Sequence, residues 1–292
     1  MEMTTDITCP WGIDSYCEGS FVLCLDGMYG AGDFVWSSLL ISLARAERSI
    51  IIISASHSPE HWECLLRKNA DLRRLGLENI YIKYVVPNSV VSEEERRYAN
   101  SSSFCSDYCS WEELVKWQQQ GMLQTPVKDK VLAPTLDKKH VETNINTNAC
   151  VFVDDLNALE IFSPNQRDAR FFMNGLLHAL HCNNNEHSIG AYAGALVVLG
   201  PAESPVTLDS CEEPSLTEVC KSRADITIAV VPLSTGYSQE VHGMVHITAM
   251  PVTTSTNGSK GRPGSLLEEI MSFKLVRPNT IISQRMTGKR TT

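Results

Sequence analysis

A glycine-rich segment that follows a short apolar run constrains this chain more than any other feature. Residues 27–34 read Gly-Met-Tyr-Gly-Ala-Gly-Asp-Phe, and the apolar residues 21–25 precede them. Gly27 and Gly32 have four residues between them, as do the glycines of loops that bind phosphate between a strand and a helix. The segment therefore predicts a P-loop-type scaffold.

The two positions that carry the chemistry of such loops hold unsuitable residues. A working loop continues with Lys, which reaches the β- and γ-phosphates, and with Ser or Thr, whose hydroxyl holds Mg²⁺. Asp33 and Phe34 occupy these positions. Losing one such charged contact costs roughly two to three orders of magnitude in affinity, and here the charge is reversed. We expect no nucleotide cofactor, no metal and no catalysis from this chain alone.

A pair of carboxylates ends an apolar run farther along the chain. Asp154 and Asp155 follow residues 149–153, and an Asp in this place holds Mg²⁺ in P-loop enzymes. The predicted degenerate nucleotide-binding site thus comprises Gly27, Gly30, Gly32, Asp33, Phe34 and Asp154. Asp155 has an alternative role as a helix N-cap, and the glycines have one as a tight turn without a ligand.

Apolar runs alternate with amphipathic stretches through the first two-thirds of the chain. Strands are predicted at 21–25, 49–55, 79–86, 149–153, 193–199 and 225–231, and helices at 34–46, 59–75 and 168–182. This alternation favours an α/β fold with a mostly parallel sheet and helices on both faces. A hairpin predicted at 239–251 and a strand pair at 272–276 and 280–282 would add an antiparallel C-terminal edge.

The polar stretch at 87–148 interrupts this alternation. It is predicted to be a surface insertion with one short helix at 111–120. We therefore predict a flexible N-terminus at 1–20, a single domain at 21–284 that carries the insertion, and a basic tail at 285–292.

The composition argues against several classes of protein. A net charge of −9 disfavours a protein that binds nucleic acid alone, since phosphate binding depends on basic residues. No apolar run is long enough to span a bilayer, and the N-terminus does not match a secretory signal. The 10 cysteines are scattered without paired spacings, which indicates a reducing compartment, the cytoplasm, the nucleus or both.

Three segments resemble the family of Elongator complex subunit six. The most specific lies between residues 223 and 243, with Arg-Ala-Asp-Ile-Thr-Ile at 223–228, Val-Pro-Leu-Ser-Thr-Gly at 231–236 and Val-His-Gly at 241–243. Residues 25–40 and 151–156 match the same family in the same order. The resemblance covers most of the chain outside 87–148 and the two ends, and it implies a RecA-like, ATPase-like domain.

The resemblance also implies partners and a role. Elongator subunits four, five and six form a hetero-hexameric ring with two copies of each, which joins the catalytic subassembly and binds tRNA. The complex modifies the wobble uridine (U34) of tRNA, and the chemistry takes place in another subunit. Arg167 and Arg170 are expected on the loop after the Asp154 strand, where RecA-type proteins touch nucleic acid, so they are the candidate RNA contacts.

We therefore expect a non-catalytic ring subunit that supports tRNA modification in the cytoplasm and nucleus, without membrane association. Two alternatives stay open. The chain could be a ring ATPase whose site a neighbouring subunit completes, which saturable ATP binding would favour. It could also be an assembly adaptor without RNA contact, which crosslinking to tRNA would exclude.

Overall fold

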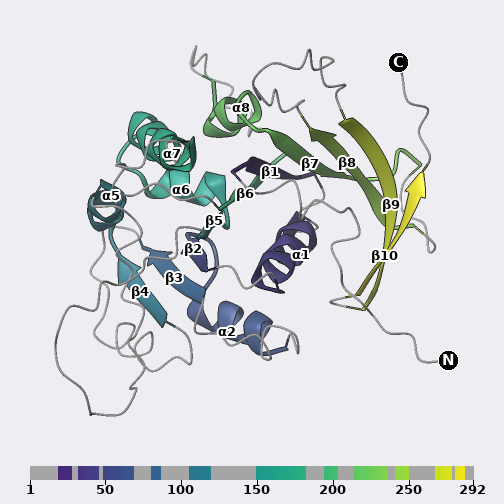
Figure 1. The fold of residues 1–292 in the computed structure, drawn as a ribbon, viewed down its shortest axis with the longest axis horizontal. Helices are drawn as coiled ribbons and strands as arrows, with labels where there is room; N and C mark the ends of the chain where they lie inside the picture. The colour runs from purple at the N-terminus through teal and green to yellow at the C-terminus, as the bar shows by residue number, and fades with distance from the viewer. Residues whose placement is uncertain are drawn as a thin grey trace, which may run out of the picture.

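The computed structural model describes eleven segments of the chain: residues 19–27, 32–45, 49–68, 80–86, 105–119, 149–181, 194–202, 214–235, 241–249, 267–277 and 280–286. The strands in these segments form one sheet (Figure 1). They are β1 (Phe21–Asp26), β2 (Ile50–Ser54), β3 (Ile80–Val85), β4 (Cys105–Cys109), β5 (Cys150–Val153), β6 (Leu196–Pro201), β7 (Ile226–Val231), β8 (Gly243–Ala249), β9 (Leu267–Arg277) and β10 (Thr280–Met286). The helices are α1 (Gly32–Arg45), α2 (Pro59–Lys68), α5 (Trp111–Gln119), α6 (Leu156–Phe162), α7 (Gln166–His181) and α8 (Leu216–Lys221).

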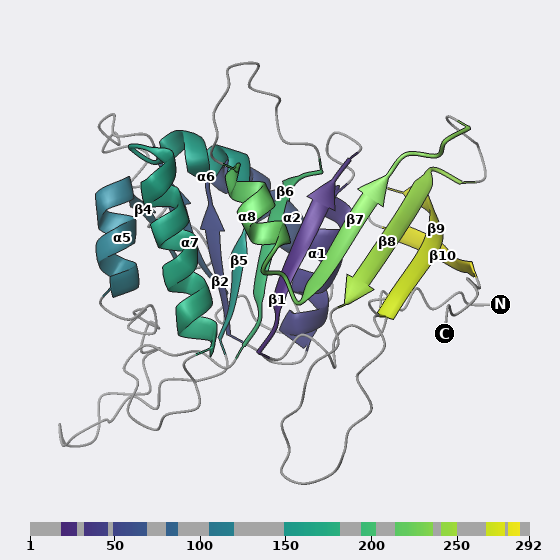
Figure 2. The ribbon, with the colours of Figure 1, turned by 90° about the horizontal axis from the view of Figure 1, so that it is seen from above.

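The strand order is β10-β9-β8-β7-β1-β6-β5-β2-β3-β4. From β7 to β4 all neighbouring strands run parallel, whereas β8, β9 and β10 are antiparallel to their neighbours. Helices α1 and α2 cover one face of the sheet, and α5 to α8 cover the other (Figures 1 and 2). The predicted α/β class, with its mostly parallel sheet, helices on both faces and antiparallel C-terminal edge, is confirmed.

The burial of each strand follows its place in the sheet. The central strands β1, β2 and β5 are buried along nearly their whole length, which explains why they read as unbroken apolar runs. By contrast, β7 and β8 alternate between buried and partly exposed residues, as antiparallel strands with one solvent-facing side do. The two faces hold separate apolar clusters, one under α1 and α2 and one under α5 to α8.

Strand β1 lies at a topological switch point. The chain leaves β1 through α1 on one face and reaches β2, three places away, while β7 follows α8 on the other face. Ligands of open α/β sheets bind beside the carboxyl ends of strands at such a point. The carboxyl ends of β1, β5 and β2 therefore define the place to look for a site.

Several predicted elements need correction. Residues 105–109, expected in a surface insertion, form β4 at the sheet edge, where Lys83 Nζ donates to Asp107 Oδ2 at 3.0 Å. Residues 243–249 form the single strand β8 rather than a hairpin, and the short α6 was not predicted. A strand at the edge of a sheet needs no apolar run, because a neighbouring strand covers only one of its two hydrogen-bonding edges. The predicted N-terminal segment and basic tail lie outside the described residues except for 19–20 and 285–286.

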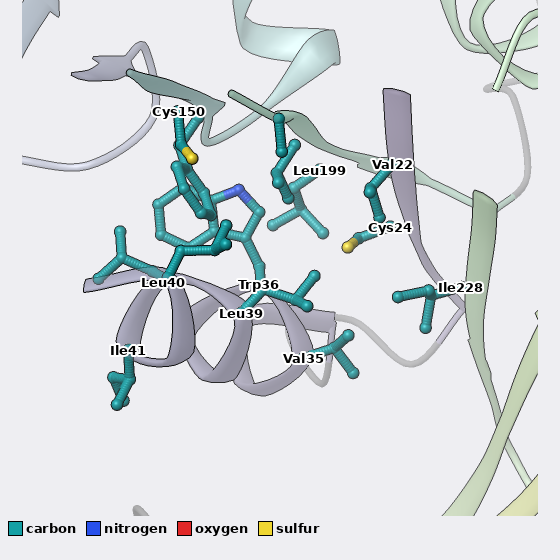
Figure 3. Packing of buried hydrophobic residues seen from close by; sticks show 14 of the residues in the cluster. Val22, Cys24, Val35, Trp36, Leu39, Leu40, Ile41, Cys150, Leu199 and Ile228 are labelled. Carbon is teal, nitrogen blue, oxygen red and sulfur yellow. The ribbon is translucent and has the colours of Figure 1, made fainter. Parts of the chain in front are cut away.

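Aromatic side chains fasten α1 to the sheet. Trp36 lies 5.2 Å from Trp62 and 5.1 Å from Phe152 between ring centroids, and its Nε1 donates to the Val153 carbonyl at 3.2 Å. Figure 3 shows the Trp36 side chain pointing from α1 toward the strands. Phe34 contacts Phe273 of β9, with ring centroids 4.7 Å apart. None of the described helices is both long and apolar enough to cross a membrane.

We predict that Phe273→Ala lowers the free energy of unfolding by about 3–5 kcal/mol, because Phe273 is 1% exposed and its loss leaves a cavity. The matched control is Phe171→Ala, since Phe171 is 72% exposed, and its effect should stay within about 0.5 kcal/mol. Urea denaturation measures both values. Equal effects of the two variants would contradict the packing described here.

Candidate functional site

The glycines of the predicted loop are required by close packing. A Cβ on Gly27 would lie 2.7 Å from the Val230 carbonyl oxygen, and one on Gly32 would lie 2.7 Å from the Asp26 Cβ. The Gly27 N–H also donates to the Val230 carbonyl at 2.9 Å. Both glycines thus have a reason to be glycine that involves no ligand. Gly30 lies outside the described residues.

Carboxylates surround the N-terminus of α1, where a phosphate would bind. Asp33 lies in the first turn of α1. Burial raises the pKa of Asp33 above its usual 3.8, and the nearby charges of Asp26, Asp154 and Asp155 raise it further against the opposing effect of His57. A helix N-terminus attracts anions through its dipole, but the charges here repel them.

Phe34 takes the place of the hydroxyl that would hold Mg²⁺. Its ring packs on Phe273 instead of facing a ligand. The residue therefore contributes to the contact between α1 and the antiparallel edge of the sheet.

Asp154 at the end of β5 is buried and bound by internal donors. It is 1% exposed. Its Oδ2 accepts from Ser54 Oγ at 2.6 Å and lies 3.1 Å from His57 Nδ1, while its Oδ1 accepts from the Ala55 N–H at 2.7 Å. The Ser56 N–H lies 3.4 Å from both oxygens. The carboxylate thus binds the chain that leaves β2.

His57 and its neighbours complete this arrangement. The His57 and His61 ring centroids lie 4.2 Å apart, and Trp62 Nε1 donates to Ser54 Oγ at 2.8 Å. The hydrogen bond to Asp154 raises the pKa of His57, although burial opposes it. Burial lowers the pKa of His61, and the charge of His57 lowers it further.

Asp155 is the N-cap of α6. Its Oδ1 accepts from the N–H groups of Asn157 at 2.8 Å and Ala158 at 3.1 Å. Burial raises the pKa of Asp155 above its usual 3.8 despite these hydrogen bonds. Of the two roles considered for this residue, the structure shows the cap.

These residues do not fit a bound magnesium nucleotide. A triphosphate at α1 would meet Asp33 where it needs a cation, and Mg²⁺ would meet a buried Asp154 whose oxygens already accept from several donors. Magnesium prefers accessible carboxylates together with phosphate oxygens and waters. Within the described segments, no group of three or more His, Cys, Asp or Glu side chains could hold a metal ion.

Ser56, His57 and Asp154 do not form a nucleophile triad either. In such a triad the serine and the carboxylate bind opposite nitrogens of the imidazole ring. Here Ser56 Oγ lies 2.9 Å and Asp154 Oδ2 lies 3.1 Å from the same nitrogen, His57 Nδ1. The arrangement positions chain segments and activates no hydroxyl.

The two candidate RNA contacts lie in the first turns of α7 rather than on a loop. The side chain of Arg167 is exposed. Arg170 donates from Nη2 to the Pro214 carbonyl. Burial raises the pKa of the Glu160 carboxyl above its usual 4.5, and the nearby charge of Arg170 opposes this rise. The structure therefore directs Arg170 toward the segment before α8.

Sequence reasoning missed Ser54, His57 and His61. A usable signal was present for two of them, because Ser54 ends the buried strand β2 and His57 follows shortly after it, whereas His61 lies in the first turn of α2. Polar side chains that follow neighbouring parallel strands meet at one edge of the sheet. β2 and β5 are neighbours, but the sequence did not reveal that pairing.

Comparisons with known proteins give remote similarities. No protein-family model matches the sequence, and no curated protein is significantly similar to it. The solved structures that are similar to this chain include a KaiC-like protein of Pyrococcus horikoshii, with 13% identity and a TM-score of 0.46 over 91% of this chain and 90% of that one. They also include a flagellar accessory protein FlaH of Methanocaldococcus jannaschii, with 12% identity and a TM-score of 0.46 over 98% of each chain. A DnaB-like replicative helicase has 11% identity and a TM-score of 0.44 over 89% of this chain and 56% of that one. Similarity at these levels assigns neither a family nor an activity to this chain.

We predict that the free energy of unfolding falls as the pH rises above about 6.5, because of His57. Its folded-state pKa is raised, so its bond to Asp154 stabilises the fold fully below the unfolded-state pKa of about 6.5 and is lost as the pH passes the folded-state pKa. His61, with its lowered pKa, acts on the other side and destabilises the fold below about pH 6.5. Chemical denaturation at a series of pH values measures both trends.

The variant His57→Gln should remove the decline above about pH 6.5, and the control His61→Gln should keep it. Asp33 and Asp155 also face His57, with pKa values raised from 3.8 by burial, and both variants retain them. The difference between the variant and wild-type curves therefore isolates the histidine. A decline that survives in His57→Gln would refute the assignment.

Proposed function

We propose that this chain is a non-catalytic RecA-like subunit of a hetero-hexameric ring in the Elongator complex, where it supports tRNA binding and modification of the wobble uridine. One observation carries the non-catalytic part. Asp33 places a carboxylate where a nucleotide site needs a cation. Asp154 is at the position of a metal ligand, but it is buried and its oxygens already accept hydrogen bonds from its own chain.

The energetic consequence is large. A missing charge-assisted contact to phosphate costs about 1.5–3 kcal/mol, and a carboxylate in its place adds repulsion. Releasing Asp154 for a metal would also break its bonds to Ser54, Ala55 and His57. Each lost hydrogen bond to a charged group costs about 1.5–3 kcal/mol. The isolated chain is therefore unsuited to ATP hydrolysis.

The family assignment rests on the sequence resemblance, and the fold supports it by position. The matching residues 25–40 cover the end of β1 and most of α1, residues 151–156 cover β5 and the start of α6, and the segment from 223 to 243 covers β7. These segments are far apart in the sequence, but β7 adjoins β1, and only β6 separates β1 from β5. The resemblance thus concentrates in the sheet around the switch point.

A ring explains how a domain without its own activity can serve an enzyme. RecA-type domains that pack head to tail make heterologous interfaces, which close into a ring when the rotation allows. In the proposed role, subunits four and five supply the other positions, and the assembled ring binds tRNA for the catalytic subassembly. Any nucleotide-dependent step then belongs to sites on other subunits.

We predict that the isolated chain shows no saturable binding of Mg²⁺-ATP up to about 1 mM in isothermal titration calorimetry. Asp33→Ala removes the repelling carboxylate but supplies no cation, so it should also remain without measurable binding. Asp168→Ala on α7 is the control for a general change of charge. Saturable micromolar binding by the wild-type chain would refute this prediction and favour a ring ATPase.

We also predict that the chain co-assembles with Elongator subunits four and five into particles with two copies of each. Native mass spectrometry of the three co-produced chains measures the stoichiometry, and a gel-shift assay then measures tRNA binding by the purified particle. Absence of this chain from the particle would refute the proposed function. Assembly without tRNA binding would favour an adaptor.

A further inference from the structure

Two histidines at the strand-end site lie together in a way that the roles described above do not explain. His57 lies in the turn that follows β2, and His61 lies in the first turn of α2. Their ring centroids are 4.2 Å apart, and their ring planes make an angle of 31°. The two residues are four positions apart in the sequence, which is the spacing of histidine pairs that bind a metal ion from one face of a helix.

The hydrogen bond between His57 and Asp154 determines which ring nitrogen of His57 is available. Asp154 Oδ2 lies 3.1 Å from His57 Nδ1. A carboxylate only accepts, so the proton of this bond belongs to Nδ1. Within the described segments, no hydrogen bond occupies Nε2 on the other side of the ring. A histidine that binds a metal ion is typically backed in this way by a carboxylate on its second nitrogen.

The burial of this pair matches the role of a carboxylate behind a metal ligand. The side chain of Asp154 is 0% exposed, whereas that of His57 is 23% exposed. The imidazole therefore connects a buried carboxylate with the surface. In sites of this kind the carboxylate fixes the orientation of the ring and raises its basicity as a ligand.

His61 can supply a second nitrogen. Its side chain is exposed, and its ring packs edge-on against Trp62 at 5.7 Å between centroids and an angle of 87°. Burial lowers the pKa of His61, and the charge of His57 lowers it further. The neutral imidazole, which is the form that binds metal ions, therefore prevails near neutral pH.

The charges around the two rings favour a cation. The carboxylates of Asp154, Asp33 and Asp155 all act on His57. Asp154 and Asp155 already accept hydrogen bonds from their own chain. These carboxylates therefore contribute negative potential rather than further ligands.

The donor atoms decide the class of ion. Imidazole nitrogen suits zinc and its neighbours among the transition metals, whereas magnesium and calcium take oxygen ligands. Two histidines fall short of the groups of three side chains considered above. Water, or a ligand from another molecule, would fill the remaining positions of a tetrahedral zinc ion, as in zinc sites that keep an open position.

We infer that His57 and His61 form a two-histidine site for zinc(II), with Asp154 as the carboxylate behind His57. Binding makes two bonds from zinc to nitrogen and displaces water and any proton from the ligating nitrogens, while the Nδ1 proton of His57 stays on its bond to Asp154. A bound ion would link the turn after β2 to the first turn of α2. The inference does not depend on the proposed function, because both ligands belong to this chain.

Isothermal titration calorimetry of the full chain with zinc chloride tests the inference. The wild type should show a saturable zinc site that His61→Gln weakens at least about tenfold, since loss of a partner behind the ligand alone costs about 10–100-fold. His61 is exposed and its replacement keeps the His57–Asp154 bond, so thermal unfolding without zinc should be unchanged. The matched control is His178→Gln, an exposed histidine of α7, which should bind zinc as the wild type does.

NMR of the imidazole groups gives a second measurement that separates this site from zinc bound by cysteines. Zinc should shift the signals of His57 and His61, assigned through His57→Gln and His61→Gln, and leave the signal of His178 in place. Equal affinity of the wild type and His61→Gln, or zinc-induced shifts that spare His57 and His61, would overturn the inference and indicate an adventitious ion only. Either result leaves the proposed function intact, because that function is tested by assembly with other subunits.

Discussion

The buried carboxylate of Asp154 holds together the part of the molecule in which a site would form. It ends β5 and accepts hydrogen bonds from Ser54 and Ala55, at the point where the neighbouring strand β2 ends. His57 adds a third donor and stacks on His61 at the start of α2. A buried carboxylate is stable only when such donors satisfy it, so the path of the chain after β2 depends on this residue.

In the proposed non-catalytic role, the same carboxylate also distinguishes this site from a P-loop nucleotide site. In such a site an aspartate at the end of this strand would hold a metal ion. Here its oxygens accept hydrogen bonds from the protein itself. Asp33 brings a carboxylate that repels phosphate, and Phe34 packs on Phe273 of β9. The two changes reinforce one another, because a scaffold without a phosphate-binding cation has no use for a metal ligand.

We propose a non-catalytic ring subunit because Asp33 and Phe34 stand where a phosphate-binding loop carries a cation and a hydroxyl. In the proposed role, the domain performs no chemistry and contributes through the partners that it holds.

The sequence by itself determined the α/β class, the parallel centre of the sheet and the unsuitable residues at the loop, because periodicity and residue chemistry are local properties. The strand pair β9–β10 was also visible in the sequence. The polar edge strand β4 was not, because its place depends on pairing with β3. Only the tertiary structure decided that β2 adjoins β5 and so brought Ser54 and His57 onto Asp154, residues about a hundred positions away. The physical reason is that strand order is fixed by packing across the whole sheet, which no local pattern records.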